Sequence, residues 1–163
     1  MIAVLMGVSG SGKTTIGRLV AQRLAWRFID ADDHHPKANV DKMAAGVALQ
    51  DADRWPWLDE LNRLLRAERD AVLACSALKE SYRRRLLDGV THARLVYLEG
   101  DRALIAARLA ARKHRYMPAS LLDSQFATLE PPGADENPIV VSIGAPPEEV
   151  IAELIRRLRE RVP

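Results

Sequence analysis

The segment from Gly7 to Thr14 reads Gly-Val-Ser-Gly-Ser-Gly-Lys-Thr and fits the pattern G-x-x-x-x-G-K-[ST]. It follows an apolar run and precedes a segment of helical period, as a phosphate-binding loop (P-loop) requires. Its glycines let backbone N–H groups approach an anion at a helix N-terminus, where the helix dipole favours negative charge. The expected ATP ligands are Gly7, Ser9, Gly10, Ser11, Gly12, Lys13, Thr14 and Thr15. A glycine-rich turn without a ligand is the alternative, but eight positions in register argue against it.

Three acids follow another apolar run, in Phe28-Ile29-Asp30-Ala31-Asp32-Asp33. Strand alternation puts Asp30 and Asp32 on one side, at the carboxyl end of a strand, where ligands of open α/β sheets collect. We expect Thr14 to bind Mg²⁺ and Asp30 to hold it through water. Lys13 and Asp32 are the expected catalytic residues: Lys13 reaches the β and γ phosphates, and Asp32 orients or deprotonates the acceptor hydroxyl. A solvated acidic turn is the alternative, and Asp33 fits that alternative better.

Two missing motifs narrow the reaction. The chain has no N-K-x-D motif of the kind that reads guanine in GTPases, so a signalling switch is disfavoured. The apolar run 71–75 also ends without the Asp that a Walker B strand supplies to Mg²⁺. Phosphoryl transfer to a small molecule fits the remaining features better.

A scaffold of alternating strands and helices must position these residues. Strands are predicted at 2–6, 27–30, 70–75, 93–98 and 139–143, and helices at 13–24, 57–69, 79–87, 101–112 and 146–161. This alternation predicts an α/β fold with helices around a parallel sheet, in one domain spanning residues 1–163. We expect a loop at 127–138, and a mobile segment from Asp32 to Asp53 that covers the acceptor.

Composition excludes several classes of function. Hydrophobic residues make up 48% of the 163 and charged residues 28%, which is too apolar for a disordered chain. The net charge of only +2 gives little support to nucleic-acid binding, and the opening apolar run stops at Gly7, too short to span a membrane. Cys75 is the only cysteine, so no intrachain disulfide can form, which favours the cytoplasm.

Further motifs resemble those of the gluconate kinases (gluconokinases), small P-loop enzymes related in fold to shikimate and adenylate kinases. Besides Gly7 to Thr14, the matching blocks are Asp30-Ala31-Asp32, His35-Pro36, Asn39, Lys42-Met43, Gly46, Asp51, Asp53-Arg54, Pro56-Trp57-Leu58, Cys75-Ser76-Ala77-Leu78-Lys79, Tyr82-Arg83, Leu122, Ser124-Gln125-Phe126 and Leu129-Glu130. The Walker motif is shared by many families, whereas the blocks at 75–79 and 124–126 are much more particular.

The resemblance implies ATP-dependent phosphorylation of D-gluconate at its 6-hydroxyl, which gives 6-phosphogluconate. It also implies a P-loop NTPase fold like that of nucleoside monophosphate kinases, with a five-stranded parallel sheet of order 2-3-1-4-5, and a homodimer. An acceptor-binding insertion is expected at about 32–56 and a lid at about 112–122. In that lid the family usually has Arg-x-Gly-His-Phe, whereas His114 and Arg115 replace Gly and His here, and His34 stands at a position that is commonly apolar.

On the acceptor side, a helix that starts at Lys79 would bring Tyr82 and Arg83 onto one face. Two cations and a phenol suit the carboxylate and hydroxyls of gluconate. A solvated basic face is an equal alternative from the residues alone, because Arg84 and Arg85 continue the run.

His35 and Arg54 are the other expected acceptor ligands, ahead of Asn39 and Lys42, although isolated polar residues in such segments are more often surface groups. For Trp57 we expect core packing rather than ligand stacking.

Arg108 and Arg112 lie four residues apart in a predicted helix that leads to the lid. We expect both to bind ATP, and Arg112 to be catalytic because it could neutralise charge on the transferred group. A pair of exposed helix arginines is the alternative. Cys75 is expected to be a small buried residue rather than a nucleophile.

Two other functions remain open from the sequence. One is a kinase like shikimate kinase, or one for another small acid, and the other is a nucleotide-binding regulatory protein without turnover. Acceptor-dependent release of ADP separates the three.

Overall fold

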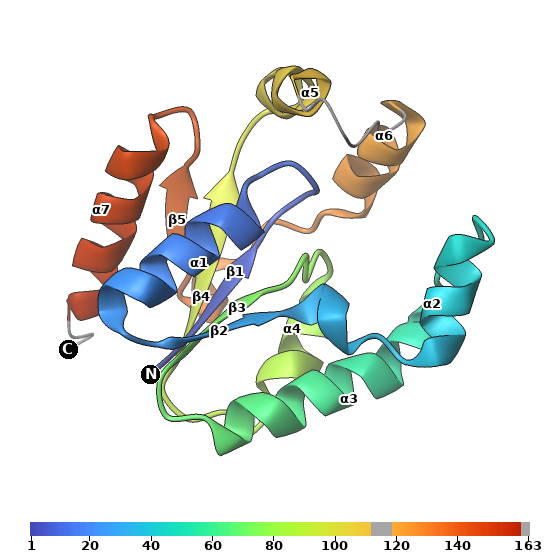
Figure 1. The fold of residues 1–163 in the computed structure, drawn as a ribbon, viewed down its shortest axis with the longest axis horizontal. Helices are drawn as coiled ribbons and strands as arrows, with labels where there is room; N and C mark the ends of the chain where they lie inside the picture. Colours follow the sequence, from blue (N-terminus) through green and yellow to red (C-terminus); the bar gives the residue numbers. More distant parts are fainter. Residues whose placement is uncertain (112–118, 161–163) are drawn as a thin grey trace.

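Five parallel strands form one sheet in this protein, whose computed structural model describes residues 1–111 and 119–160. The strands are β1 (Ile2–Met6), β2 (Arg27–Asp30), β3 (Ala71–Ala74), β4 (Ala93–Glu99) and β5 (Ile139–Ser142). Their order is β2-β3-β1-β4-β5, with β1 in the middle (Figure 1). The predicted fold class and strand order are confirmed.

Strand β1 is apolar at every position because the sheet is covered on both faces. Ala3 and Leu5 pack into one core cluster, whereas Ile2, Val4 and Met6 pack into another on the opposite face. Alternation along the strand separates the two sets.

Helices cover both faces of the sheet (Figure 1). The helices are α1 (Lys13–Leu24), α2 (Lys37–Ala44), α3 (Asp51–Ala67), α4 (Glu80–Leu87), α5 (Arg102–Ala110), α6 (Ala119–Thr128) and α7 (Pro147–Arg159). Side chains of α1, α5, α6 and α7 fill one core cluster, and those of α3 and α4 fill the other. None of the helices in the described ranges is both long and apolar enough to cross a bilayer.

The predicted strands match the structure within one residue at each end, and the main errors concern helices. Helix α3 starts at Asp51 instead of residue 57, because Gln50 and Asp53 form a capping box, and the helix continues through Pro56. Helix α2 lies in the segment from Asp32 to Asp53, where we expected mobility and predicted no helix. It buries only Asn39, so its sequence carries no apolar stripe that would reveal a helix.

Candidate active site

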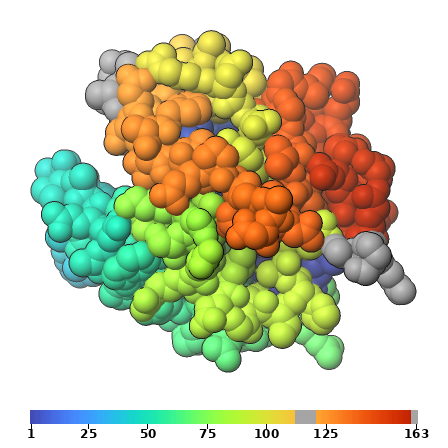
Figure 2. All heavy atoms as spheres, turned by 180° about the vertical axis from the view of Figure 1, so that it is seen from behind, coloured from blue at the N-terminus to red at the C-terminus, as the bar shows by residue number. Residues whose placement is uncertain are grey.

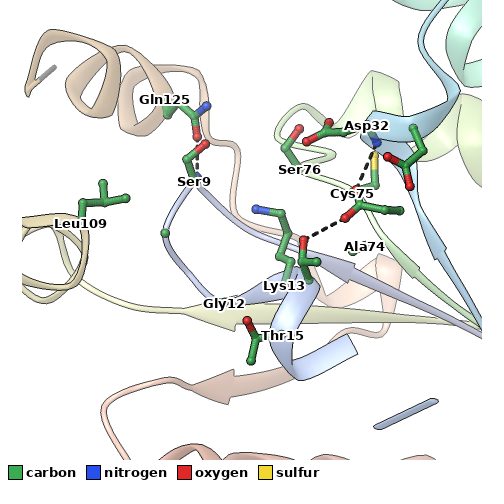
Figure 3. Close-up of a pocket in the computed structure, with 14 residues that line it drawn as sticks. Ser9, Gly12, Lys13, Thr15, Asp32, Ala74, Cys75, Ser76, Leu109 and Gln125 are labelled. Carbon is green, nitrogen blue, oxygen red and sulfur yellow. Dashed lines mark hydrogen bonds between the residues drawn. The ribbon is translucent and has the colours of Figure 1, made fainter. Parts of the chain in front are cut away.

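A cleft of about 920 Å³ opens at the carboxyl ends of the strands (Figure 3). Its walls come from the P-loop and the start of α1, the residues after β2 and β3, and one side chain each from α5 and α6. Of the eight expected P-loop ligands, all but Gly7 and Ser11 line it. Ser11 is fully buried, so its side chain does not face the cleft.

Glycine is required at Gly10 for two independent reasons. Its φ of 88° lies in the left-handed region, and a Cβ atom there would come within 2.9 Å of Leu109 on α5. The loop can therefore lie against α5 and still turn its amides toward the cleft.

The Lys13 ammonium lies across the P-loop. Its Nζ donates to the carbonyl oxygens of Gly7 and Val8, both at 2.9 Å. Figure 3 shows this side chain between the Ser9 side and the Asp32 side of the cleft. The charge is thus already held where a phosphate on the loop would meet it.

Asp30 connects the P-loop helix to the acidic turn. Its Oδ2 accepts a hydrogen bond from Thr14 Oγ1 at 3.0 Å, and its Oδ1 accepts one from the Asp32 backbone at 3.2 Å. Hydroxyl and carboxylate oxygens are the ligand types that Mg²⁺ prefers, so the pair fits the ion.

The alternation argument assumed that the strand continues through Asp32, but it does not. Strand β2 ends at Asp30, and Asp32 lies in a 3₁₀ turn over Ala31–His34. The turn nevertheless brings Asp32 into the wall of the cleft, and its side chain is 87% exposed. A carboxylate in that position is accessible to a substrate hydroxyl.

His35 lies behind Asp32 rather than in the open cleft. The ring stacks on Trp57 at 4.1 Å between centroids, and only 7% of the side chain is exposed. Its Nδ1 is 3.4 Å from Asn39 Nδ2, and its Nε2 is 3.8 Å from Asp32 Oδ1. Burial lowers the pKa of His35; Asp32 opposes that shift, and Arg54 adds to it. Trp57 itself is buried and donates to the Ala31 carbonyl, which confirms its expected core packing.

Lys79 and Tyr82 converge, as expected, but on a protein carboxylate that the site prediction did not include. Both donate to Asp51 at the first turn of α3, with Lys79 Nζ at 3.0 and 3.1 Å from its two oxygens. Hydrogen bonds from Tyr82 and Lys79 lower the pKa of Asp51, and the bond to Asp51 raises that of Lys79. Arg54 lies over the Tyr82 ring, 5.5 Å from its centroid.

The structure separates Arg83 from these residues and corrects its expected role as an acceptor ligand. Arg83 is 1% exposed, and its Nε and Nη2 pair with Glu136 at 2.6 and 2.8 Å. Its Nη1 donates to the carbonyls of Ala77, Leu78 and Glu130. Because these contacts occupy the guanidinium, it ties α4 to the segment after α6, and these two parts lie against each other in Figure 2.

Arg108 lies beside a second, mainly apolar pocket of about 350 Å³ that shares Gly10, Gly12 and Thr15 with the cleft. Its guanidinium donates to the Ile143 carbonyl. Arg112 and the lid departures at His114 and Arg115 lie outside the described residues, as does most of the expected lid.

Cys75 follows the last residue of β3 in the cleft wall and is 2% exposed, as expected of a small buried residue. Burial raises the pKa of its thiol to about 12, so the thiolate needed for nucleophilic attack does not form near neutral pH.

Comparison with known proteins gives consistent results. The profile of the shikimate kinase family matches residues 9–159. The chain is 48% identical to the gluconokinase of Gluconobacter oxydans (strain 621H), with 96% of this chain and 90% of that protein covered. It is 43% identical to the thermoresistant gluconokinase of Escherichia coli (strain K12), with 98% and 94% covered.

A solved structure agrees with these relatives. The gluconokinase from Sinorhizobium meliloti 1021 superposes with a TM-score of 0.89 at 38% identity, and the match covers 96% of this chain and 90% of that one.

Proposed function

This chain belongs to the gluconokinases, within the wider family that the shikimate kinase profile describes, and we propose that it transfers the γ-phosphoryl group of ATP to the 6-hydroxyl of D-gluconate. The products are 6-phospho-D-gluconate and ADP. The observation that carries the proposal is the placement of a P-loop and an exposed carboxylate, Asp32, on opposite walls of one cleft.

The P-loop amides and Lys13 would bind the phosphates of ATP, and Thr14, with Asp30 through water, would hold Mg²⁺. The ion would supply positive charge that neutralises the charge developing on the phosphates. Lys13 adds a fixed positive charge at the same place, supported by its two backbone contacts.

Asp32 accepts the proton of the 6-hydroxyl as that oxygen attacks the γ-phosphorus. Its exposure makes it accessible to the substrate, and the Nε2 edge of His35 lies behind it. Such a general base contributes about 10²- to 10⁴-fold to the rate.

The far end of gluconate lies toward the start of α3, where Arg54, Lys79 and Tyr82 surround Asp51. Here Lys79 and Arg54 attract the substrate carboxylate, and the Asp51 oxygens accept hydrogen bonds from its hydroxyls. Asp51 also keeps Lys79 in place before the substrate arrives.

The apolar pocket beside Arg108 takes the adenine ring, because it is continuous with the P-loop through Gly10, Gly12 and Thr15. Arg108 and Arg112 bind the phosphates on lid closure, and Arg112 stabilises the transferred group. The lid spans about 112–122 and the acceptor-binding insertion about 32–56, within a single domain over 1–163. The enzyme is proposed to act as a homodimer in the cytoplasm.

Acceptor identity is tested by incubating the purified protein with Mg-ATP and D-gluconate, shikimate or no acceptor, followed by phosphorus NMR of the products. We expect one new phosphomonoester signal, with gluconate only and coupled to the protons on carbon 6. A signal with shikimate alone would move the assignment to the other acid, and ATP binding without any phosphoester would support the regulatory alternative.

A further inference from the structure

Gln125 is a polar residue on the inner face of α6. Leu122 lies three residues before it, Leu129 four residues after it just past the end of the helix, and Phe126 next to it; all three pack into or against the core cluster beneath. Gln125 shares their side of the helix but lines the cleft instead. An amide among apolar neighbours points to a specific partner.

That partner is the P-loop. The Ser9 backbone N–H donates to Gln125 Oε1 at 2.6 Å, across 116 residues of sequence (Figure 3). This distance is slightly shorter than the usual range for an N–H···O bond. Ser9 also lines the cleft, so its N–H is one of the donors that the loop can offer to a phosphate.

The Ser9 N–H cannot donate to Gln125 and to a phosphate at the same time. A phosphate oxygen needs donors around it, whereas the amide of Gln125 now presents its acceptor oxygen to the loop. Rotation of the terminal amide by about 180° exchanges that oxygen for the NH₂ group, and the backbone need not move.

We propose that Gln125 is a phosphate-binding residue that exchanges roles with the loop: its oxygen holds the Ser9 N–H until phosphate takes that donor, and its NH₂ group then donates to the same phosphate. This inference rests on ATP binding by the proposed kinase and goes beyond the P-loop ligands already named. It makes α6 a second wall of the phosphate site.

The anchoring of α6 suits this role. On the N-terminal side of Gln125, Asp123 pairs with Arg102 of α5. On its C-terminal side, the Glu130 backbone N–H donates to the Leu78 carbonyl at 2.8 Å. The helix is therefore fixed at both sides of Gln125, so a side-chain rotation is sufficient for the exchange.

Two variants separate phosphate binding from simple anchoring of α6. Gln125→Glu keeps the acceptor for Ser9 but loses the donor and adds a negative charge, and Gln125→Met keeps the length with neither donor nor acceptor. If Gln125 only anchored the helix, Met would lose that anchor and bind nucleotide more weakly than Glu, which keeps the acceptor for Ser9. Our proposal predicts the reverse order for nucleotide affinity.

The measurement is the Kd of a non-hydrolysable ATP analogue with Mg²⁺, by calorimetry, for the wild type, both variants and the exposed neighbour Ser124→Ala as control. We expect the Kd to rise at least tenfold for Glu and less for Met, with no change for Ser124→Ala. The negative charge of the phosphates raises the pKa of the new carboxyl, so partial protonation at pH 5 restores a donor in Gln125→Glu and its deficit relative to the wild type should shrink there.

An affinity of Gln125→Glu equal to the wild type, or lower affinity for Met than for Glu, would overturn the proposal. Thermal unfolding of each variant checks that it is folded at the temperature of the titration. The wild-type titration and its turnover with gluconate test the kinase assignment separately, so failure of the Gln125 proposal leaves that assignment intact.

Discussion

Asp32 lies at the end of a short polar chain that starts at a buried amide. Asn39 is 3% exposed, and its Nδ2 donates to the Asp53 carbonyl at 2.9 Å, which fixes it against the first turn of α3. The same nitrogen faces Nδ1 of His35, so Nε2 carries the ring proton and directs it toward Asp32. At the residue scale, the carboxylate that we propose as the base therefore lies in front of a buried histidine.

This arrangement predicts a contribution of His35 to the pH dependence of stability. Burial is the main cause that lowers its pKa below 6.5, while Asp32 raises the pKa and Arg54 lowers it. The unfolded chain therefore takes up the proton more readily than the folded one, so the stability that His35 contributes is present above pH 6.5 and is lost as pH falls through the folded pKa. We expect His35→Gln to reduce the drop in melting temperature between pH 7.5 and pH 5.5.

The matched control is His92→Asn, which changes an exposed histidine at a left-handed position that Asn tolerates. An identical pH dependence in the wild type and His35→Gln would contradict the burial argument.

At the scale of elements, the buried Arg83 joins three pieces of the chain that only the fold brings together. It links α4, the turn at Ala77 and Leu78, and the segment that carries Glu130 and Glu136. The bond with Arg83 is the main cause of the lowered pKa of Glu136. Breaking one side of such a buried pair costs more than replacing both, because an uncompensated charge is left inside.

We expect Glu136→Ala to lower the free energy of unfolding by about 3 kcal/mol, and a double Arg83→Met and Glu136→Leu variant to recover much of that loss. Urea denaturation measures both, with the exposed neighbour Asp135→Ala as control. A loss below about 0.5 kcal/mol in Glu136→Ala would show that the pair is not important for stability.

Across the whole molecule, the features that could be predicted from the sequence are those that short local patterns determine. The apolar run at 2–6 and the glycine spacing of the P-loop gave the central strand and the phosphate site, because period and turn chemistry are local properties. The partners of Arg83 and Gln125 could not be predicted from such patterns, since Glu136 lies 53 residues away and Ser9 lies 116 away. For Gln125 one local signal existed: a polar residue in the apolar stripe of Leu122, Phe126 and Leu129.

Helix α2 is a local element that the sequence pattern did not predict. Its large apolar side chains Val40 and Met43 are exposed, so its helical period does not mark a buried face. Helix α2 lies within the segment 32–56 that we propose as the acceptor-binding insertion, and it adds little to the core.

The most direct test of the account is the rate of ADP release from Mg-ATP with and without D-gluconate, for the wild type and Asp32→Asn. We predict strong gluconate-dependent release in the wild type and a loss of about 10²- to 10⁴-fold in the variant. Asp41→Asn, an exposed acid paired with Lys37 on α2, should match the wild type. Release that is independent of gluconate, or undiminished in Asp32→Asn, would contradict the central claim that this cleft phosphorylates gluconate with Asp32 as the base.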